Sequence, residues 1–484
     1  MKLNSISKIK FNDGIVVKNI GWGVLLNIFQ NVFNSIFFIV VAREFNTSEF
    51  SNYIIANNLY GLVLSFSSLG LGQWFLREIQ IEKDYQTLCN KYLKIQFLIG
   101  ILFYLINILI CYSIYENEMI IRLSIILGVN IILDNILNVF KFININTSRQ
   151  YYTFLFLSSE AIFKFLCAIL LLLYGLGMFP LIIITVGIKL IVVIVFFRNG
   201  LPLHINTHSF IKTKVKIKEV FQLIRKNISF AIIGTMSVLF WGIGNLIVSK
   251  YLTINDVAYY DIIFKLFTMA QIMPVIFSIT VFPLLVTGVI KGKNELKSIV
   301  NRYYWLYLIY GITSYVAVYS YIDYIIPNLF GTKYTEAVLY CKEMFLTMII
   351  FPIVLLQANL LISIKKESVD MWMNIVVLFV NTITSMWGIL YYKSLTTINN
   401  SVFLSFLLFL VMQDIYITKI KLKNKKDISN QYLIIGSVIM FCYLSSKYIN
   451  IYFIFPVFVI ILITILVINK YLFGDVKPNL LKLK

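Results

Sequence analysis

The sequence predicts an all-α membrane protein that crosses the bilayer many times, and three observations support this. Of the 484 residues, 60% are hydrophobic and 13% are charged, whereas soluble domains average roughly 45–50% apolar and about 25% charged residues. The apolar residues gather in blocks of about 20, the length that an α-helix needs to span a membrane. Within these blocks they do not alternate with polar residues, as they would in an outer-membrane β-barrel.

Fourteen such blocks follow one another, each bounded by polar or charged residues, and each is predicted to be a transmembrane helix. Six of them precede the longest polar segment, Arg198–Asn227: Gly21–Ala42, Asn52–Phe75, Ile95–Tyr115, Leu123–Phe140, Tyr152–Leu176 and Met178–Phe197. Eight follow it: Ile228–Val248, Ala258–Ile290, Tyr303–Tyr321, Met344–Ile364, Met371–Tyr391, Ser401–Thr418, Gln431–Ser446 and Asn450–Ile468.

The basic residues predict how these spans are oriented. The chain holds 42 Lys and Arg against 22 Asp and Glu, a net charge of +20. If the N-terminus is cytoplasmic, 32 of the 42 basic residues fall in cytoplasmic segments, 7 in external loops and 3 inside spans. Basic residues concentrate in the cytoplasmic loops of membrane proteins. We therefore expect both termini to be cytoplasmic, and the positive charge does not indicate nucleic acid as a partner.

An internal repeat predicts the domain organisation. Val41–Tyr53 after the first span resembles Val248–Tyr260 after the seventh, at a constant offset of 207 residues. Six spans separate the two segments, so both halves have the same orientation and form a parallel repeat. The predicted domains are an N-terminal lobe (residues 1–197, helices 1–6), a cytoplasmic linker (198–227), a C-terminal lobe (228–418, helices 7–12) and two appended helices with a cytoplasmic tail (419–484).

Short motifs also occur at several places in both halves. The first half has Ala42-Arg43 with Glu49, Phe50 and Tyr53, then Ser68-Leu-Gly-Leu-Gly72 and Arg77-Glu78; the second has Tyr259-Tyr260, Lys265-Leu266 and Phe282-Pro283-Leu284. These motifs resemble the polysaccharide-exporter branch of the multidrug/oligosaccharidyl-lipid/polysaccharide (MOP) superfamily. The similarity is closest to Wzx-type flippases of O-antigen or capsule repeat units, although Ser51 stands where that family usually has glycine.

The resemblance implies a MATE-like fold of two six-helix lobes around a central cavity. It also implies a function: moving an undecaprenyl-pyrophosphate-linked oligosaccharide from the inner to the outer leaflet by alternating access. Such a flippase makes and breaks no bond, so no catalytic residue and no cofactor are expected. The implied location is the bacterial cytoplasmic (inner) membrane, with membrane lipid and other polysaccharide-assembly membrane proteins as neighbours.

Charged residues inside a membrane are costly, roughly 2.5–3.5 kcal/mol each on insertion scales, and are candidates for function. Seven fall inside the predicted spans: Asp134, Glu160, Lys164, Lys189, Asp261, Lys265 and Asp414. Lys265, which also matches the family pattern, is the preferred ligand for a pyrophosphate, with Asp261 one turn away, and Lys164 with Glu160 is the second choice. An intrahelical ion pair without a ligand explains both pairs equally simply. For Lys189 we expect a side chain that extends to the cytoplasmic surface.

Amides in the first and fourth spans are spaced to lie on one helix face each, where they would suit the hydroxyl groups of an oligosaccharide. These candidate cavity residues are Asn27, Asn31 and Asn34 in the first span, and Asn130, Asp134 and Asn138 in the fourth. Hydrogen bonding between helices is the structural alternative. Arg77, at the cytoplasmic end of the second span, would meet a lipid phosphate first or would simply anchor the helix.

Several other classes of site and function are disfavoured or left open. The five cysteines form no CxxC, and His204 and His208 lack acidic or thiol co-ligands nearby, so no metal site is predicted. A membrane polymerase or glycosyltransferase usually has a large external loop, whereas Ile322–Glu343 is short. A multidrug exporter would favour an acidic pocket, and a teichoic-type polymer exporter stays open. So does coupling to a proton or sodium gradient, for which Asp134, Glu160 and Asp261 are the candidates.

Overall fold

The computed structural model describes residues 13–69, 71–81, 84–200, 213, 215, 217–226, 228–448 and 450–473. Within these ranges the chain is almost entirely helical and forms no β-strand, as the sequence predicts. Ten of the helices in the described residues are long and apolar enough to cross a membrane. The all-α, multi-pass fold is therefore confirmed, while the full number of fourteen spans and the cytoplasmic position of the termini stay predictions.

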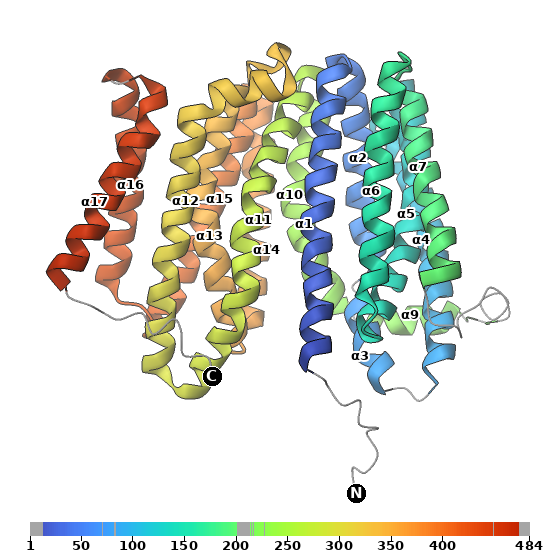
Figure 1. Ribbon diagram of the computed structural model, residues 1–484, viewed down its shortest axis with the longest axis horizontal. Helices are drawn as coiled ribbons and strands as arrows, with labels where there is room; N and C mark the ends of the chain where they lie inside the picture. Colours follow the sequence, from blue (N-terminus) through green and yellow to red (C-terminus); the bar gives the residue numbers. More distant parts are fainter. Residues whose placement is uncertain are drawn as a thin grey trace, which may run out of the picture. The chain divides into compact units, whose positions relative to one another are not determined.

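By its internal contacts the chain divides into two units, which Figure 1 shows with the helices labelled along the sequence. Unit 1 comprises Met1–Lys265 and Asn374–Ile398, and unit 2 comprises Leu266–Met373 and Asn399–Lys484. These units are defined by which residues contact one another, whereas the predicted lobes are defined by the internal sequence repeat. The predicted division into lobes of residues 1–197 and 228–418 therefore stays a prediction.

Unit 1 holds the helices of the first half and the start of the second. Its helices are α1 (Asp13–Glu44), α2 (Thr47–Ser67), α3 (Leu71–Ile81), α4 (Tyr85–Ile114), α5 (Glu118–Asn146), α6 (Gln150–Leu173), α7 (Met178–Val195), a π-helical turn (Phe196–Gly200), α9 (Ile217–Lys226) and α10 (Ile228–Tyr251). Helix α1 packs against α6, α2 against α5 and α10, and α5 and α6 both pack against α7. The short helices α3 and α9 lie at the end of unit 1 where α1 begins (Figure 1).

Unit 2 is built on a long antiparallel pair, α12 (Lys293–Phe330) and α13 (Ala337–Ser363), joined through a 3₁₀ turn at Thr332–Tyr334. The other helices of the second half are α11 (Ile254–Lys291), α14 (Glu367–Tyr392), α15 (Leu395–Lys419), α16 (Lys425–Tyr448) and α17 (Ile451–Phe473). Helices α11, α14 and α15 contribute residues to both units. Helix α12 packs on α16 and α17, which correspond to the two appended helices.

The repeat is exact at the helix boundaries. Helix α1 ends at Glu44 and α10 at Tyr251, and α2 begins at Thr47 and α11 at Ile254, so both boundaries differ by 207 residues. Equivalent polar residues also precede the second helix of each pair. The Asn46 side chain accepts a hydrogen bond from the Glu49 amide, and Thr253 exchanges hydrogen bonds with Asp256 in a reciprocal cap. The same local sequence thus forms the same helix–turn–helix twice.

One predicted span is wrong in its extent. The second block was expected to be a single helix over Asn52–Phe75, but α2 ends at Ser67 and a separate helix, α3, begins at Leu71. The hydroxyls of Ser65, Ser67 and Ser68 each bond a carbonyl three residues earlier, which competes with regular helix hydrogen bonding. Leu69 follows with a φ of 46°, so the chain turns before the amphipathic α3.

Candidate functional site

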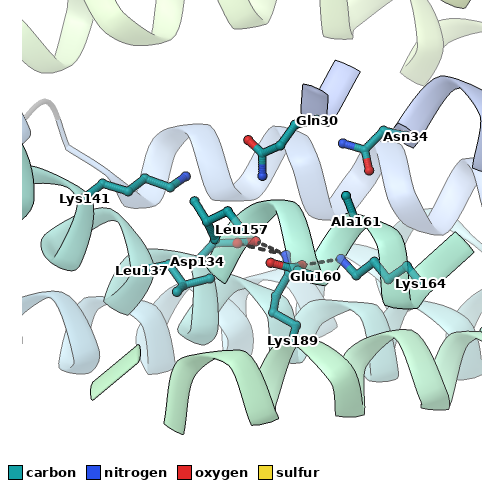
Figure 2. A pocket seen from close by; sticks show the side chains of 10 residues that line it. All are labelled: Gln30, Asn34, Asp134, Leu137, Lys141, Leu157, Glu160, Ala161, Lys164 and Lys189. Atoms are coloured by element: carbon teal, nitrogen blue, oxygen red, sulfur yellow. Dashed lines mark hydrogen bonds and ion pairs between the residues drawn. The ribbon is translucent and has the colours of Figure 1, made fainter. Parts of the chain in front are cut away.

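A polar cavity of about 140 Å³ opens among four helices of unit 1. Its walls carry five charged side chains, although the helices themselves are predominantly apolar. Figure 2 shows the residues that line it: Gln30 and Asn34 from α1; Asp134, Leu137 and Lys141 from α5; Leu157, Glu160, Ala161 and Lys164 from α6; and Lys189 from α7.

The centre of the cavity is an ion pair between two helices. The Lys189 ammonium on α7 donates to both carboxylate oxygens of Asp134 on α5, at 2.8 Å each. The Tyr60 hydroxyl on α2 donates to the same carboxylate and lies 3.5 Å from the Lys189 Nζ atom. The side chains of Lys189 and Asp134 are 10% and 17% exposed. Asp134 is therefore held by donors from two other helices.

A second ion pair lies within one helix. Glu160 and Lys164 on α6 are one turn apart, and the Lys164 ammonium donates to the Glu160 carboxylate. The ion pair that the spacing predicts is thus present, and both of its members line the cavity. The sequence leaves a self-satisfied ion pair and a ligand-binding pair as alternatives for these two residues, and the role of ligand stays a prediction.

Lys141 differs from the other two lysines of the cavity. No hydrogen bond or ion pair joins Lys141 to any other lining residue. In Figure 2 the ammonium end of its side chain points toward the Gln30 side chain. Because three lysines face two carboxylates here, the cavity has one net positive charge on simple counting. An ammonium without a carboxylate partner in a partly desolvated pocket is suited to bind an anion.

The size of the cavity limits what it can hold. Its volume is an order of magnitude above the roughly 10–15 Å³ that one water molecule needs. It can therefore admit water or a small charged group, whereas an oligosaccharide of several rings requires far more room. The chemistry that the site supports is the binding of one anionic group beside the amides of Gln30 and Asn34.

Comparison with known protein families matches residues 16–289 to the polysaccharide biosynthesis protein family. That match covers more than half of the chain. The chain belongs to this polysaccharide biosynthesis family. A comparison with curated protein sequences gave no significant match.

Solved structures place this family member in the MOP superfamily fold. The lipid II flippase MurJ, in an inward closed conformation, aligns with a TM-score of 0.70 and 13% identity over 93% of this chain and 98% of its own. An inward-facing multidrug resistance transporter of the MATE family aligns with a TM-score of 0.65 and 10% identity, over 81% of this chain and 95% of its own. These two neighbours are a flippase and a transporter, and their similarity to this chain is one of fold, which is the MATE-like fold that the motifs predict.

The preferred pair of the MOP resemblance, Asp261 and Lys265, lies on α11, away from the lining of the cavity. The Asp261 carboxylate accepts a hydrogen bond from the Asn58 side chain on α2, at 3.1 Å. The Lys265 ammonium lies 5.7 Å from the centre of the Phe38 ring on α1. The role of Lys265 as a phosphate ligand stays a prediction, and the structure does not bring it together with the α6 pair.

The predicted amide faces contribute to the cavity in part. Asn34 and Asp134 line it, whereas Asn27, Asn31, Asn130 and Asn138 are not among its lining residues. Asn27 is exposed and donates to the Gly23 carbonyl of its own helix. Asn130 is buried and its side-chain oxygen has no hydrogen-bond partner. Whether these four amides contact sugar stays a prediction.

Two other expectations are revised or left aside. The prediction that Lys189 extends to the cytoplasmic surface is wrong, because the residue is only 8% exposed and its ammonium binds Asp134. Arg77 lies on α3 and not at the end of α2. His204 and His208 lie outside the described residues. Within those residues, no group of three or more His, Cys, Asp or Glu side chains could hold a metal ion.

The sequence analysis missed Lys141 and Tyr60. Lys141 was counted with the cytoplasmic flank of a span predicted to end at Phe140, but α5 continues to Asn146. Lys141 follows Asp134 by seven residues, about two helical turns, so the two share one face. That spacing could have identified it. Tyr60 gives no such signal, since tyrosine is common at membrane interfaces.

Unit 2 contains a separate buried polar cluster around Asp414 on α15. The Asp414 carboxylate accepts hydrogen bonds from Gln357 at 2.9 Å, from Tyr432 at 3.0 Å and from Lys423 at 3.1 Å. Lys423, in the turn after α15, also donates to Gln431 at 2.6 Å. Burial lowers the pKa of the Lys423 ammonium, and the adjacent Asp414 carboxylate opposes that shift. With every charge bonded, this cluster joins α13, α15 and α16 and is structural.

Proposed function

We propose that this MOP transporter flips an undecaprenyl-pyrophosphate-linked oligosaccharide repeat unit, of the O-antigen or capsule kind, from the inner to the outer leaflet. The proposal includes alternating access of two lobes and no chemical step. It also places the protein in the bacterial cytoplasmic membrane, near other polysaccharide-assembly membrane proteins. Coupling to a proton or sodium gradient is part of the same proposal.

The observation that supports it best is the charge of the α1–α5–α6–α7 cavity. Three lysines and two carboxylates leave one positive charge in a cavity whose other lining residues are two amides and three apolar side chains. A pyrophosphate is the charged part of the proposed substrate and the part that membrane lipid solvates worst. The cavity would thus bind the part of the substrate whose passage through the membrane costs the most free energy.

The volume of the cavity indicates which part of the substrate it can hold. A site of about 140 Å³ accommodates a phosphate-sized group and not the sugar chain. We therefore assign the phosphate part of the substrate, and not the sugar chain, to this cavity. Gln30 and Asn34, whose amides face the charged residues in Figure 2, would contact the first sugar or the bridging phosphate.

A multidrug exporter for organic cations is the main alternative, and the charge of the cavity argues against it. A cation would have to compete with three lysines for two carboxylates that are already bonded. A teichoic-type polymer exporter also carries phosphate, so the same cavity would serve it. The experiment below separates these alternatives through the material that accumulates.

The test is deletion of the gene in a host that makes a surface glycan. We expect lipid-linked repeat units to accumulate on the cytoplasmic leaflet and surface polysaccharide to disappear, with both restored by a plasmid copy. The measurement is mass spectrometry of extracted lipid-linked oligosaccharide together with surface staining. Normal surface glycan with altered drug tolerance would contradict the proposal, and accumulation of long polymer in place of single units would favour the polymer exporter.

A further inference from the structure

The two ion pairs of the cavity are built differently. Glu160 and Lys164 belong to one helix and one turn, so their contact is local. Asp134 is instead bonded to residues of two other helices. Its two carboxylate oxygens accept hydrogen bonds from the Lys189 ammonium on α7, and the Tyr60 hydroxyl on α2 also donates to it. The donors around Asp134 thus form a small anion-binding site that a side chain of the protein already occupies.

Carboxylate and phosphate oxygens require the same partners from such a site. Both accept charge-assisted hydrogen bonds from an ammonium and a hydroxyl group. We propose that the Asp134 carboxylate is an internal substitute for the substrate's phosphate, which holds Lys189 and Tyr60 while the cavity is empty and is displaced when a diphosphate group binds. This inference rests on the proposed function and concerns how the same site takes up and releases its ligand.

An internal competitor solves two physical problems of a transport site. When the cavity is empty, Lys189 would be a buried charge without a partner, which is strongly unfavourable. When the substrate must leave, three lysines in a poorly solvated pocket would hold a diphosphate too tightly, and transport requires a site weak enough to release. Return of Asp134 to Lys189 lowers the net affinity and hastens release.

Lys141 completes the sequence of events. No other lining residue bonds it, so its ammonium is available to an arriving anion before any ion pair breaks (Figure 2). Lys141 and Asp134 lie on α5, and Lys189, on α7, is bonded to Asp134 in the same cavity. An anion first held by Lys141 is therefore positioned to compete with Asp134 for Lys189.

The test measures binding of inorganic pyrophosphate to the purified full-length protein by isothermal titration calorimetry. We expect Asp134→Asn to tighten binding by about tenfold or more, because one charged hydrogen-bonding competitor is removed. Lys189→Met should weaken binding by a similar factor. The decisive variant is Asp134→Asn with Lys189→Met, in which Asp134→Asn should add no more affinity than the loss of one carboxylate charge from the cavity adds.

Glu160→Gln is the matched control, since it removes the same charge from the same cavity. The effect of Glu160→Gln on affinity comes from charge alone and should be the same with and without Lys189, whereas the effect of Asp134→Asn should shrink in the Lys189→Met background to the size of the Glu160→Gln effect. In a flipping assay with lipid-linked oligosaccharide, Asp134→Asn should bind substrate but turn over more slowly. Asp134→Ser replaces Asp134→Asn if thermal unfolding shows that the amide lowers stability.

Three results would overturn the inference: unchanged or weaker pyrophosphate binding in Asp134→Asn, a gain that survives undiminished in the double variant, or no pyrophosphate binding in any variant. The gene deletion tests the proposed function separately. If deletion leaves the surface glycan intact while the binding pattern holds, the flippase proposal fails and the role of Asp134 stands for another phosphorylated substrate.

Discussion

At the scale of single residues, sequence and structure favour different lysines as the anion ligand. The sequence favours Lys265, because it matches the family pattern, whereas the structure places Lys141, Lys164 and Lys189 together around one cavity. Lys164 and Lys189 are engaged with carboxylates in that cavity, and Lys141 is bonded to none of its neighbours there. Charge count alone could not distinguish these lysines, because their partners come from several helices.

Substitution at Lys141 and Lys265 decides between the two. We expect Lys141→Ala to lower repeat-unit export about tenfold through loss of a charged hydrogen bond to phosphate, with Lys141→Arg retaining most of it. The measurement is surface glycan in a deletion strain that expresses each variant at equal level. Lys293→Ala, an exposed lysine at the start of α12, serves as the control and should export normally.

Lys265→Ala belongs in the same experiment, and the sequence-based proposal predicts complete loss of complementation for it. Full export by Lys141→Ala together with loss in Lys265→Ala would move the anion site from the cavity to α11. The reverse pattern would leave Lys265 as a residue that packs against Phe38.

At the scale of helices, most boundaries could be predicted because hydrophobic length is a property of the sequence alone. The end of α2 could not, because Phe75 and its neighbours are apolar enough to continue a span. Three serine hydroxyls and the left-handed Leu69 end the helix instead. Composition averages over a window of about 20 residues and does not register a local change in hydrogen bonding.

Close packing of α12 on α13 predicts an effect at Gly311. A Cβ atom there would lie 2.7 Å from the Met348 carbonyl oxygen and 2.9 Å from that of Ile349, both backbone atoms that cannot turn away. We expect Gly311→Ala to destabilise the protein by about 1–3 kcal/mol, the usual cost of overpacking. Thermal unfolding in detergent measures it.

Gly436 on α16 is the matched control. No heavy atom lies within 4 Å of the position that its Cβ would take. The stability of Gly436→Ala should therefore change only through the higher helix propensity of alanine. That preference stabilises a helix by up to about 1 kcal/mol. Equal melting temperatures for the two variants would mean that α12 and α13 are not as close as described.

At the scale of the whole molecule, the distribution of basic residues predicts the orientation. With 32 of 42 Lys and Arg on one side, both termini should be cytoplasmic. A reporter fused after Lys484 is expected to be active only as a cytoplasmic fusion. In a variant without native cysteines, Lys393→Cys should react with a membrane-impermeant thiol reagent in intact cells and Lys366→Cys should not. Labelling of Lys366→Cys in place of Lys393→Cys would reverse the orientation.

The sequence by itself determined the class of this protein: a multi-pass helical member of the polysaccharide biosynthesis family. Hydrophobic length, charge asymmetry and the 207-residue repeat are local or additive properties, so they can be read without knowing which helices touch. Only the tertiary structure decided the site. Asp134, Lys189 and Tyr60 come from three helices, and an ion pair between helices depends on packing that no spacing along the chain encodes. The distribution of the +20 net charge predicts the orientation of the protein, but the one unmatched positive charge in a cavity of about 140 Å³ is what suggests its ligand.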